Sequence, residues 1–417
     1  MARTSVLFVH NNFPGQFRHI AAHLAQDPRF GVTAFTSGSA RPIPGVRLLR
    51  YQLPTELPES VSVHPFARRF EGECARAEQV MYLGTSLRAE GVEPDIIFVH
   101  PGWGEALPLR VLFPSARICT FCEFYYHPVG ADVGFDREFP QMGLDGLVRV
   151  KLRNAATLLS LVDADVGISP TRWQRQVYPA EFRSKIRVIH EGIDVQEARP
   201  DPRASYQLPD GRSVAAGDEV VTFVARNLEP YRGYHIFMRA LPALLRSRPR
   251  ARVLIVGGTG LSYGAAPAGA ESWASVFLNE VRDQLDLSRV YFLGHLERSR
   301  YLKVLQVSAA HVYLTYPFVL SWSMLEAMAA GCLVIGSDTP PVREVLEHGK
   351  TGVIVPFFDH DRIAQEVARA LANPGPYEGL RSQARSEVVA RYGVREAGLP
   401  GYIELVDQLA GGASVAV

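Results

Sequence analysis

Short apolar runs alternate with longer segments of helical spacing through the first half of the chain. Runs of strand length lie at 5–10, 32–36, 96–100, 116–121, 166–169 and 186–190. Helical spacing of apolar residues is found at 16–25, 66–89 and 147–163. Strands rich in β-branched residues that alternate with helices predict a parallel sheet with helices on both of its faces.

The composition changes between residues 200 and 217, where Pro, Asp, Gly and Ser are frequent, which indicates a linker or an excursion. The alternation then starts again, with strands expected at 220–225, 252–256, 290–293, 311–314, 332–336 and 352–355. The segment 261–270 is expected to be a surface loop. The pattern therefore predicts an α/β fold of two similar doubly wound domains with a cleft between them. Ligands of such sheets bind outside the carboxyl ends of the strands.

Composition and charge exclude several classes of protein. Apolar residues make up 47% and charged residues 21% of the 417 residues, so a sizeable core can form. The net charge of +1 argues against a general nucleic-acid binder. The first apolar run is too short for a signal peptide, and no apolar stretch reaches transmembrane length. We therefore expect a cytoplasmic protein, and contact with the inner face of a membrane stays open.

The four cysteines, at 74, 119, 122 and 332, are too few and too scattered for a disulfide scaffold. Cys119 and Cys122 form a CxxC inside a run that has the pattern of a strand. No second Cys/His pair completes a zinc set. We therefore expect these two cysteines to be buried and structural, and we expect no metal.

The loop RNLEPYRG follows the strand expected at 220–225 and places Arg226 and Arg232 on either side of a turn. The planar guanidinium donates two parallel hydrogen bonds and stays charged, which suits a phosphate. Such a pair could clamp a diphosphate. Two solvated loop arginines are the alternative.

The stretch YPFVLSWSMLEAMAAG, at 316–331, carries one carboxylate in an almost wholly apolar run. A helix is expected to begin near Ser323, and the free amides of a helix start form an anion site. Ser323 and Glu326 have the spacing of a capping box, in which Glu326 would bond back to the backbone of Ser323. Alternatively, Glu326 accepts hydrogen bonds from the sugar hydroxyls of a nucleotide.

Glycines at the strand ends give weaker signals. Gly15 follows the first strand and would let a ligand approach the backbone closely. The run at 257–260 lacks the third glycine of the dinucleotide fingerprint, since Tyr263 stands at that position. A nicotinamide or flavin dinucleotide site is therefore poorly supported.

Five stretches carry a resemblance to a known family: IHEGID at 189–194, VARNLEPYRG at 224–233, FLGHL at 292–296, MLEAMAAGCLVIGSD at 324–338 and VREVLEHGKTGVIV at 342–355. The chain resembles glycosyltransferase family 4, whose members are retaining, nucleotide-sugar-dependent enzymes with the GT-B fold. The resemblance covers almost the whole chain. It implies a Rossmann-like acceptor-binding domain at 1–198, completed by a C-terminal helix at about 395–417, and a Rossmann-like nucleotide-sugar-binding domain at 199–394.

The resemblance also implies roles for residues that match the family's motifs. Arg226 and Arg232 would hold the donor diphosphate and stabilise charge on the leaving nucleotide, although the second position is more often Lys in the family. Glu326 would bind the ribose. Backbone amides at 321–324 would meet the phosphates. The other donor-binding positions are Gly15 facing the phosphates, Gly294 and His295 near the base, and Phe318, Leu320, Ser321, Trp322 and Ser323 at the helix start.

Two positions depart from the family's pattern. Phe318 stands where the first glutamate of the E-x7-E motif should contact the donor sugar, and a phenyl ring cannot make that contact. The family's catalytic histidine near the strand end at 116–121 is also absent, because Cys122 and Glu123 stand there. The residues expected to carry catalysis are therefore Arg226 and Arg232, with Glu123, His127 or His100 in place of the histidine.

The implied reaction moves a sugar from a nucleotide-diphosphate donor, with UDP- or GDP-sugars favoured, to an acceptor hydroxyl with retention and without a metal or cofactor. A glycan or lipid-linked acceptor in bacterial polysaccharide, lipopolysaccharide or glycoconjugate assembly is expected. Eight Lys and Arg against three acidic residues between 149 and 187 indicate a contact with lipid phosphate at a membrane, or only a solvated face. A nucleotide-sugar binder without turnover and a nucleotide-sugar epimerase stay open as alternatives.

Overall fold

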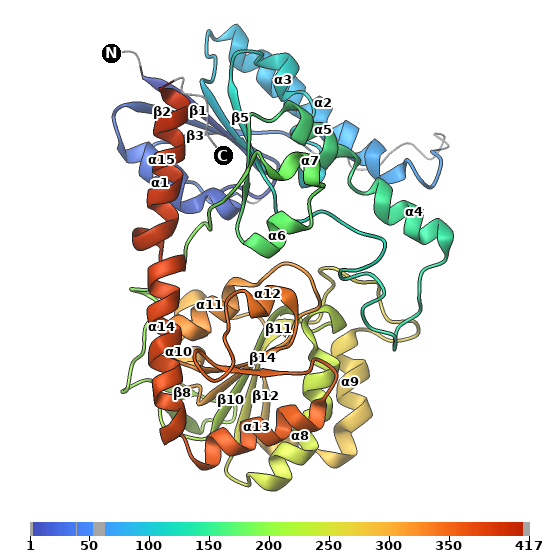
Figure 1. Ribbon diagram of the computed structural model, residues 1–417, viewed down its shortest axis with the longest axis vertical. Coiled ribbons are helices and arrows are strands. Elements are labelled where there is room, and N and C mark those ends of the chain that lie inside the picture. Colours follow the sequence, from blue (N-terminus) through green and yellow to red (C-terminus); the bar gives the residue numbers. More distant parts are fainter. Residues whose placement is uncertain (1–2, 39, 53–62, 412–417) are drawn as a thin grey trace. The chain divides into compact units, whose positions relative to one another are not determined.

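The computed structural model describes residues 3–38, 40–52 and 63–411 (Figure 1). The chain forms two compact units, which we call unit 1 (Met1–Gly192 with Ala397–Val417) and unit 2 (Ile193–Glu396). The change from unit 1 to unit 2 thus comes slightly before the boundary expected at 198–199. The outer ends of the expected first domain, at 1–2 and 412–417, lie outside the described residues, and the cleft expected between the domains stays a prediction.

Unit 1 contains a seven-stranded parallel sheet with the strand order β3-β2-β1-β4-β5-β6-β7. The order reverses between β1 and β4, and this switch point is where a doubly wound sheet binds its ligands. The edge strand β3 was not predicted, because arginines interrupt its short apolar run, VRLLR. The strands are β1 (Thr4–Val9), β2 (Phe30–Thr36), β3 (Val46–Arg50), β4 (Ile96–Val99), β5 (Arg117–Phe121), β6 (Val166–Ser169) and β7 (Ile186–Val188).

Both faces of this sheet are buried, as the alternation of side chains in β1 shows. Phe8 belongs to a core cluster with residues of α1 and the C-terminal helix α15, including Tyr402. Leu7 and Val9 belong to the opposite cluster with residues of α2 and α3, including Val80. The helices of unit 1 are η1 (Gly15–Phe17), α1 (Arg18–Gln26), α2 (Arg68–Ala89), η2 (Pro101–Trp103), α3 (Leu109–Leu112), α4 (Leu144–Leu152), α5 (Ala155–Asp163), α6 (Arg172–Gln176), α7 (Ala180–Arg183) and α15 (Leu399–Ala410).

The single helix expected at 147–163 is wrong, because α4 and α5 are separate helices in Figure 1. Asn154 lies at the break and forms two hydrogen bonds with the backbone of Tyr126: its Oδ1 accepts from the amide at 2.9 Å, and its Nδ2 donates to the carbonyl at 2.8 Å. A short polar side chain that bonds to distant backbone offers the chain an alternative to the helical ladder. These bonds connect the loop after β5 to the start of α5.

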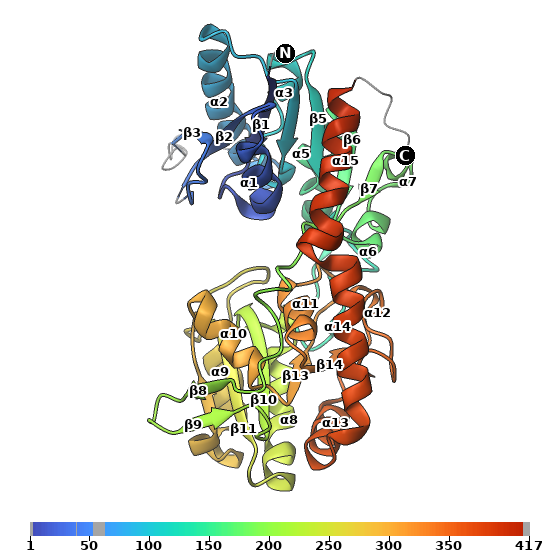
Figure 2. The same ribbon diagram turned by 90° about the vertical axis from the view of Figure 1, so that its left-hand side faces the viewer.

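Unit 2 contains a second parallel sheet, with the strand order β12-β11-β10-β13-β14-β15. Its helices cover both faces; α8 packs on α13, and α11 packs on α14 (Figure 2). The strands are β10 (Val220–Asn227), β11 (Arg252–Gly258), β12 (Val290–Phe292), β13 (Ala310–Tyr313), β14 (Leu333–Ser337) and β15 (Val353–Val355). The helices are η3 (Pro230–Arg232), α8 (Tyr234–Ser247), α9 (Trp273–Val281), η4 (Arg282–Gln284), η5 (Leu287–Arg289), α10 (Arg298–Gln306), α11 (Trp322–Ala329), α12 (Pro340–Arg343), α13 (His360–Ala372), η6 (Gly375–Tyr377), α14 (Glu378–Tyr392) and the π-helix η7 (Val394–Gly398).

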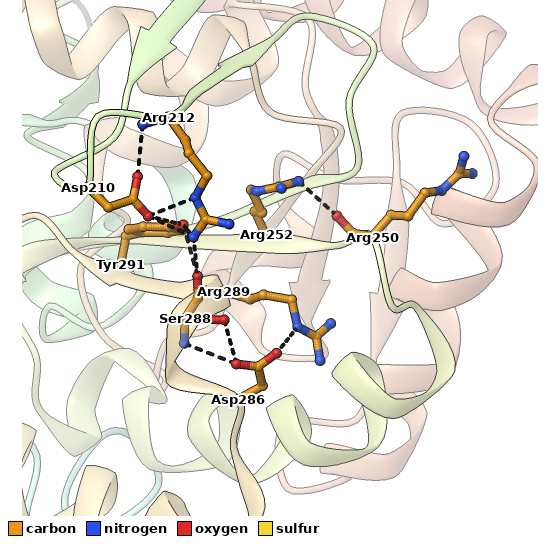
Figure 3. A network of polar contacts seen from close by, with 8 residues as sticks. All are labelled: Asp210, Arg212, Arg250, Arg252, Asp286, Ser288, Arg289 and Tyr291. Carbon is orange, nitrogen blue, oxygen red and sulfur yellow. Dashed lines mark hydrogen bonds and ion pairs between the residues drawn. The ribbon is translucent and has the colours of Figure 1, made fainter.

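The segment 200–217 is part of unit 2, so of the two interpretations of its composition the linker is wrong and the excursion is confirmed. It forms the hairpin β8 (Ser205–Gln207) and β9 (Ser213–Ala215). Figure 3 shows how Arg212 fixes this hairpin to the rest of the unit. Its Nη2 donates to Oδ2 of Asp210 at 2.7 Å, to the Ser288 carbonyl at 2.7 Å and to the Tyr291 hydroxyl at 2.6 Å. The hairpin is a separate two-stranded sheet, and these bonds attach it to the unit near the edge strand β12.

None of the helices in the described part of the chain combines the length and the apolar character that crossing a membrane requires. The segment 261–270 contains neither helix nor strand, as expected. Cys119 and Cys122 are buried free thiols, and burial raises the pKa of Cys122 to about 12. Both observations agree with the structural role expected for this CxxC.

Candidate active site

A cluster of polar side chains lies at the carboxyl ends of β1, β4 and β5 in unit 1. His10 follows β1, His100 follows β4, and Glu123 lies just beyond β5. The carboxyl ends of neighbouring parallel strands meet at one edge of the sheet, which brings these distant residues together. The ring centres of His10 and His100 are 5.4 Å apart, and Nε2 of His100 lies 3.5 Å from Oε2 of Glu123. Two of the predicted catalytic residues, His100 and Glu123, are therefore neighbours.

Gln16 connects His10 to Glu123. Nδ1 of His10 accepts the amide of Asn12 at 3.0 Å, so the proton of the neutral ring is on Nε2. Nε2 donates to Oε1 of Gln16 at 2.8 Å, and Nε2 of Gln16 donates to Oε1 of Glu123 at 3.0 Å. Burial, reinforced by the neighbouring His100, lowers the pKa of His10 to about 3. His10 is therefore neutral at physiological pH, and it orients Gln16 toward the carboxylate.

The imidazole of His100 is held on two sides. Its Nδ1 accepts the amide of Gly102 at 3.2 Å and so caps η2. Its ring stacks on Trp103, with 4.4 Å between the ring centres. His100 is buried, and this arrangement directs its Nε2 toward Glu123.

His127, the third predicted candidate, has other partners than this cluster. Its Nε2 donates to the carbonyl of Val177 at 2.5 Å, and its ring lies 5.4 Å from that of Tyr125. The bond to Val177 commits the Nε2 proton to the backbone. The contacts described for His127 thus do not include His100 or Glu123.

Gly15 lies directly against the ring of His10. Its φ of +48° is in the left-handed region, and a Cβ atom built on it would lie 2.4 Å from Nε2 of His10. Only glycine fits without movement of the imidazole. The close approach expected at Gly15 is thus made by His10 in this structure, and the contact with donor phosphates stays a prediction.

In unit 2, Arg232 lies at the carboxyl ends of β10 and β13. Its Nη1 donates to Oγ1 of Thr315 and to the carbonyl of Val319, both at 2.8 Å, and only 7% of the residue is exposed. Both acceptors belong to the segment between β13 and α11, so the guanidinium is fixed before any ligand arrives. Arg226 lies at the end of β10 and is exposed. The clamp expected from these two arginines stays a prediction.

Phe318 belongs to an aromatic cluster beside Arg232. Its ring packs edge-on against Tyr263 and Tyr231, at 4.8 Å and 5.5 Å between ring centres, and it is 2% exposed. Cζ of Arg232 lies 5.2 Å from the ring centre of Tyr263 and 6.0 Å from that of Phe318. Aromatic faces attract a guanidinium without neutralising it. Where the family's motif has a carboxylate, this chain therefore has a ring, which does not neutralise the charge of Arg232.

Helix α11 begins at Trp322, and Ser321 caps it. Oγ of Ser321 accepts the amide of Ser323 at 3.3 Å. The capping box, one of the two alternatives for Ser323 and Glu326, is therefore wrong, because the helix starts earlier and is capped by Ser321. Of the two other positions predicted here, Trp322 is exposed and Leu320 is buried in the core of unit 2.

Three of the amides expected to meet the donor phosphates, those of Ser321, Ser323 and Met324, have partners within the chain. That of Ser321 donates to the Tyr313 hydroxyl at 2.8 Å, and that of Met324 donates to the carbonyl of Ser321 at 3.2 Å. The amide of Ser323 is bonded to the cap. A phosphate at this helix start would have to replace some of these bonds.

Glu326 is buried and bonded to two residues of α10. Its Oε1 accepts from Nη1 of Arg298, and its Oε2 accepts from the Tyr301 hydroxyl at 2.6 Å. Burial and the adjacent carboxylate raise the pKa of Tyr301 well above its usual range, so this phenol stays a donor. Arg298 also donates to Oε2 of Glu197 at 2.9 Å. The structure thus places Glu326 in a network between α10 and α11.

His295 lies against the end of β11. A Cβ on Gly258 would lie 2.3 Å from Nε2 of His295 and 2.7 Å from Oδ1 of Asn227. Gly294 has a φ of +62°, and its carbonyl accepts the amide of Gly257 at 3.0 Å. The glycines at 257–258 therefore let neighbouring side chains pack directly against the backbone. This packing accounts for the glycine run, which lacks the dinucleotide fingerprint.

Three residues of these networks were not predicted from the sequence. Gln16 follows Gly15, but a lone glutamine has no recognisable pattern. Arg298 and Tyr301 have helical spacing, which indicates only that they share a face of α10. Their common partner, Glu326, lies on another helix, so only the packing of α10 against α11 could identify them.

Comparison with known families accounts for both units. The family described as "Glycosyl transferase family 4 group" matches residues 28–198, and "Glycosyl transferases group 1" matches residues 210–387. The chain belongs to glycosyltransferase family 4. Its two doubly wound units are the two Rossmann-like domains of the GT-B fold, as the sequence predicted.

Relatives of known name share parts of this chain. The D-inositol 3-phosphate glycosyltransferase of Nocardia farcinica is 31% identical over 183 residues, which is 43% of this chain and 38% of that protein. The GDP-mannose-dependent α-(1-6)-phosphatidylinositol monomannoside mannosyltransferase of Mycobacterium tuberculosis is 24% identical over 298 residues, covering 70% of this chain and 71% of that protein. The first match thus spans well under two thirds of the relative's length.

Solved structures share the fold over the whole chain. Sucrose-phosphate synthase from Thermosynechococcus elongatus has a TM-score of 0.73 at 19% identity and covers 99% of this chain and 100% of its own. HepE of Anabaena, in complex with UDP and glucose, has a TM-score of 0.66 at 15% identity, with coverages of 97% and 100%. At these identities the likeness is one of fold alone.

Proposed function

We propose that this protein is a retaining glycosyltransferase that moves a sugar from a nucleotide-diphosphate donor to an acceptor hydroxyl. The observation that carries the proposal is the fixed position of Arg232 at the strand ends of unit 2, where Thr315 and the Val319 carbonyl hold its guanidinium. A fixed cation at the place where the leaving diphosphate gains charge stabilises the transition state without reorganisation. Family membership supplies the reaction class.

On the donor side, Arg226 and Arg232 bind the diphosphate, and Glu326 accepts hydrogen bonds from the ribose. Arg226 is exposed, so it can reach a ligand that arrives from solvent. A UDP- or GDP-sugar is the donor that we propose, since one relative is named as GDP-mannose-dependent and the Anabaena neighbour was solved with UDP. The ribose must share Glu326 with Arg298 and Tyr301, which hold its carboxylate in place.

On the acceptor side, Glu123 accepts the hydrogen bond of the attacking hydroxyl. Gln16 orients its carboxylate, His100 lies beside it at 3.5 Å, and the neutral His10 fixes Gln16 in turn. With retention, the hydroxyl attacks the face from which the nucleotide leaves, so the departing phosphate can receive its proton. This step requires no metal or cofactor.

For the acceptor, we propose a glycan or a lipid-linked molecule in bacterial polysaccharide, lipopolysaccharide or glycoconjugate assembly. The names of the relatives include an inositol phosphate and a phosphatidylinositol glycoside, which supports an acceptor that bears a phosphate. We further propose that the enzyme works in the cytoplasm, at the inner face of the membrane. Basic residues between 149 and 187 support this contact.

Thermal stabilisation by UDP, GDP, ADP and TDP and their common sugars tests the donor side. We expect one nucleotide to stabilise the wild type and to stabilise Arg226→Ala and Glu326→Ala less. Arg226 is the better arginine to change, because Arg232 is buried and its loss can unfold the unit. Arg250→Ala, whose side chain is 82% exposed in the same unit, is the control. Absence of stabilisation by every nucleotide at millimolar concentration would overturn the proposal.

Product analysis separates the proposal from its two alternatives. Transfer of sugar to an added acceptor, with the anomeric configuration kept, supports the transferase. Conversion of the nucleotide sugar to an epimer without acceptor would indicate the epimerase. Binding without any product would indicate an inactive binder, for which Phe318 in place of a carboxylate is the structural motive.

A further inference from the structure

A cavity of about 470 Å³ opens on unit 1 beside the start of α2 and along α4. We call it the α4 pocket. Its volume is within the range of small-molecule sites. The lining residues that matter here are Phe66, Arg69, Met142, Leu152 and Arg153, together with the ion pair of Asp145 and Arg149. All of them belong to unit 1, and the donor side of the proposed reaction uses none of them.

Two arginines of the α4 pocket, Arg69 and Arg153, lie close to buried groups. The guanidinium of Arg153 lies over the ring of Tyr126, with 3.9 Å from Cζ to the ring centre. Its buried Nε has no hydrogen-bond partner in the described part of the chain. Arg69 forms an ion pair with Glu73 at 2.8 Å and donates to the carbonyl of Gly102 at 3.0 Å.

The two arginines are close enough to feel each other's charge. Burial and then the charge of Arg153 lower the pKa of Arg69, while burial raises the pKa of Glu73. Glu73 thus lies near both guanidiniums, while Asp145, a carboxylate of the pocket lining, is paired with Arg149 at 2.7 Å. An anion bound beside Arg153 would balance the positive charge that remains.

The lining of the α4 pocket also includes apolar side chains that are open to solvent. Phe66, Met142 and Leu152 are 36%, 53% and 40% exposed, respectively. Leu144, in the first turn of α4, is 79% exposed. Clustered apolar side chains at a surface mark an interaction site more often than scattered ones do. A ligand that fits both the arginines and these apolar side chains carries an anionic group next to an apolar body.

We propose that the α4 pocket binds a phosphate group attached to an apolar body, with Arg153 and Arg69 on the phosphate and Phe66, Met142 and Leu152 on the apolar part. The planar fork of arginine matches phosphate oxygens, and a lipid phosphate supplies both chemistries at once. Arg69 bonds the loop that carries His100, so the pocket adjoins the acceptor side of the candidate site. Its part as an acceptor subsite rests on the proposed function, but phosphate-lipid binding itself does not.

Co-sedimentation with vesicles tests this binding with the full chain. Vesicles of phosphatidylcholine alone are compared with vesicles that also contain phosphatidic acid, and glycerol 3-phosphate serves as the free phosphate probe. The variants are Arg153→Gln, Arg153→Lys and the double variant Phe66→Ser with Met142→Ser. Arg47→Gln is the charge-matched control. Arg47 lies on β3 of the same unit, is exposed and forms an ion pair with Glu90.

We expect binding only to vesicles with phosphatidic acid. Arg153→Gln should weaken it by about tenfold, which corresponds to one lost charge-assisted bond. Arg153→Lys should restore part of it, and Arg47→Gln should leave it unchanged. The double variant should weaken vesicle binding but not the binding of glycerol 3-phosphate. The partial rescue by Lys shows that a loss in Arg153→Gln does not come from misfolding.

Three results would overturn the proposal. Equal binding to phosphatidylcholine alone would exclude phosphate recognition, and equal losses in Arg153→Gln and Arg47→Gln would indicate only general electrostatic attraction. Glycerol 3-phosphate binding as tight as lipid binding would exclude the apolar part. Nucleotide stabilisation of the wild type is measured in parallel, so failure of the proposed transferase is recognised separately from failure of the pocket.

Discussion

The hydroxyl of Tyr301 donates a hydrogen bond to Oε2 of Glu326, with 2.6 Å between the two oxygens. The bond joins α10 to α11 inside unit 2. It fixes the carboxylate that the family resemblance assigns to the ribose, and Arg298 occupies the other carboxylate oxygen. Glu326 is therefore oriented by side chains before a nucleotide binds.

Tyr301→Phe should loosen this carboxylate without removing it. Loss of a hydrogen bond to a charged group should lower the free energy of unfolding by roughly 1–3 kcal/mol. Nucleotide stabilisation should also decrease, because the ribose would then have to order Glu326. Urea unfolding and thermal shifts with the preferred nucleotide measure the two effects.

Tyr206→Phe is a control for this prediction in the same unit. Tyr206 is buried, and its hydroxyl accepts a hydrogen bond from Arg300 at 3.2 Å. This bond does not involve the carboxylate of Glu326. It should leave nucleotide stabilisation unchanged. Equal losses of nucleotide stabilisation in the two variants would contradict a specific role for Tyr301.

The capping box shows where reasoning from local spacing fails. Ser323 and Glu326 have the right separation, but the amide of Ser323 is bonded to Ser321, and the carboxylate of Glu326 is bonded to α10. Spacing along a sequence identifies contacts within a turn of helix. It contains no information on a partner helix whose contact depends on packing.

The order of elements was easier to predict than these contacts. Buried strands in a parallel sheet are continuous apolar runs. The run at 166–169 predicted a strand, and β6 has these same bounds. By contrast, β3 carries arginines, and the hairpin β8–β9 is concealed in a Pro- and Gly-rich segment. Both are edge elements, which have fewer buried neighbours to impose a pattern.

Gly15→Ala should lower the free energy of unfolding by more than the strain of a left-handed backbone conformation alone. A Cβ at this position meets Nε2 of His10 at 2.4 Å, so the imidazole must move and lose its bond to Gln16. Gly91→Ala is the matched control, since Gly91 has a φ of +78° but open space around its Cβ position. We expect about 1 kcal/mol for Gly91→Ala and an additional 1–3 kcal/mol, approximately, for Gly15→Ala.

Urea unfolding of both glycine variants decides this prediction. A similar loss of stability in both would mean that His10 adapts without cost. Glu123 should also lose its orientation in Gly15→Ala, because Gln16 links it to His10. Turnover of this variant should therefore fall even at temperatures where the protein remains folded.

Glu123→Gln should slow sugar transfer while leaving the donor side intact. An amide accepts a hydrogen bond from the acceptor hydroxyl more weakly than a carboxylate, so a loss on the order of 10- to 100-fold in turnover is expected, as for one lost hydrogen bond to a charged group. Nucleotide stabilisation should not change, because Glu123 belongs to unit 1. Glu181→Gln, an exposed change in the same unit, is the control. Turnover within a few-fold of wild type would remove Glu123 from the acceptor side.

The family motifs pointed to Arg232 and Glu326 because each motif is one contiguous stretch of the sequence. The acceptor side had no such motif, and three candidates were left open. The structure narrows them by contact: His100 lies beside Glu123, whereas the Nε2 proton of His127 is committed to the Val177 carbonyl. A contact between strand ends depends on topology, which a single loop sequence does not contain.

Two buried histidines should make the protein less stable below neutral pH. Burial lowers the pKa of His10 in unit 1 and of His311 in unit 2 to about 3, against an ordinary value of 6.5. Between these pH values the unfolded chain binds a proton that the folded chain does not bind. Stability should therefore be greatest above pH 6.5 and should fall as the pH is lowered toward 3.

His311→Gln isolates this effect. Nδ1 of His311 is bonded to Oγ1 of Thr222 at 2.9 Å, and a glutamine can keep a hydrogen bond without titrating. From pH 7 to pH 5 the free energy of unfolding of the wild type should fall by roughly 2 kcal/mol more than that of His311→Gln. The difference arises because the imidazole of His311 binds a proton only in the unfolded chain. His64→Gln, at an exposed position, should retain the wild-type dependence. An equal pH dependence in wild type and His311→Gln would mean that the ring accepts a proton inside the folded unit, and an imidazole resonance that titrates near pH 6 would show this directly.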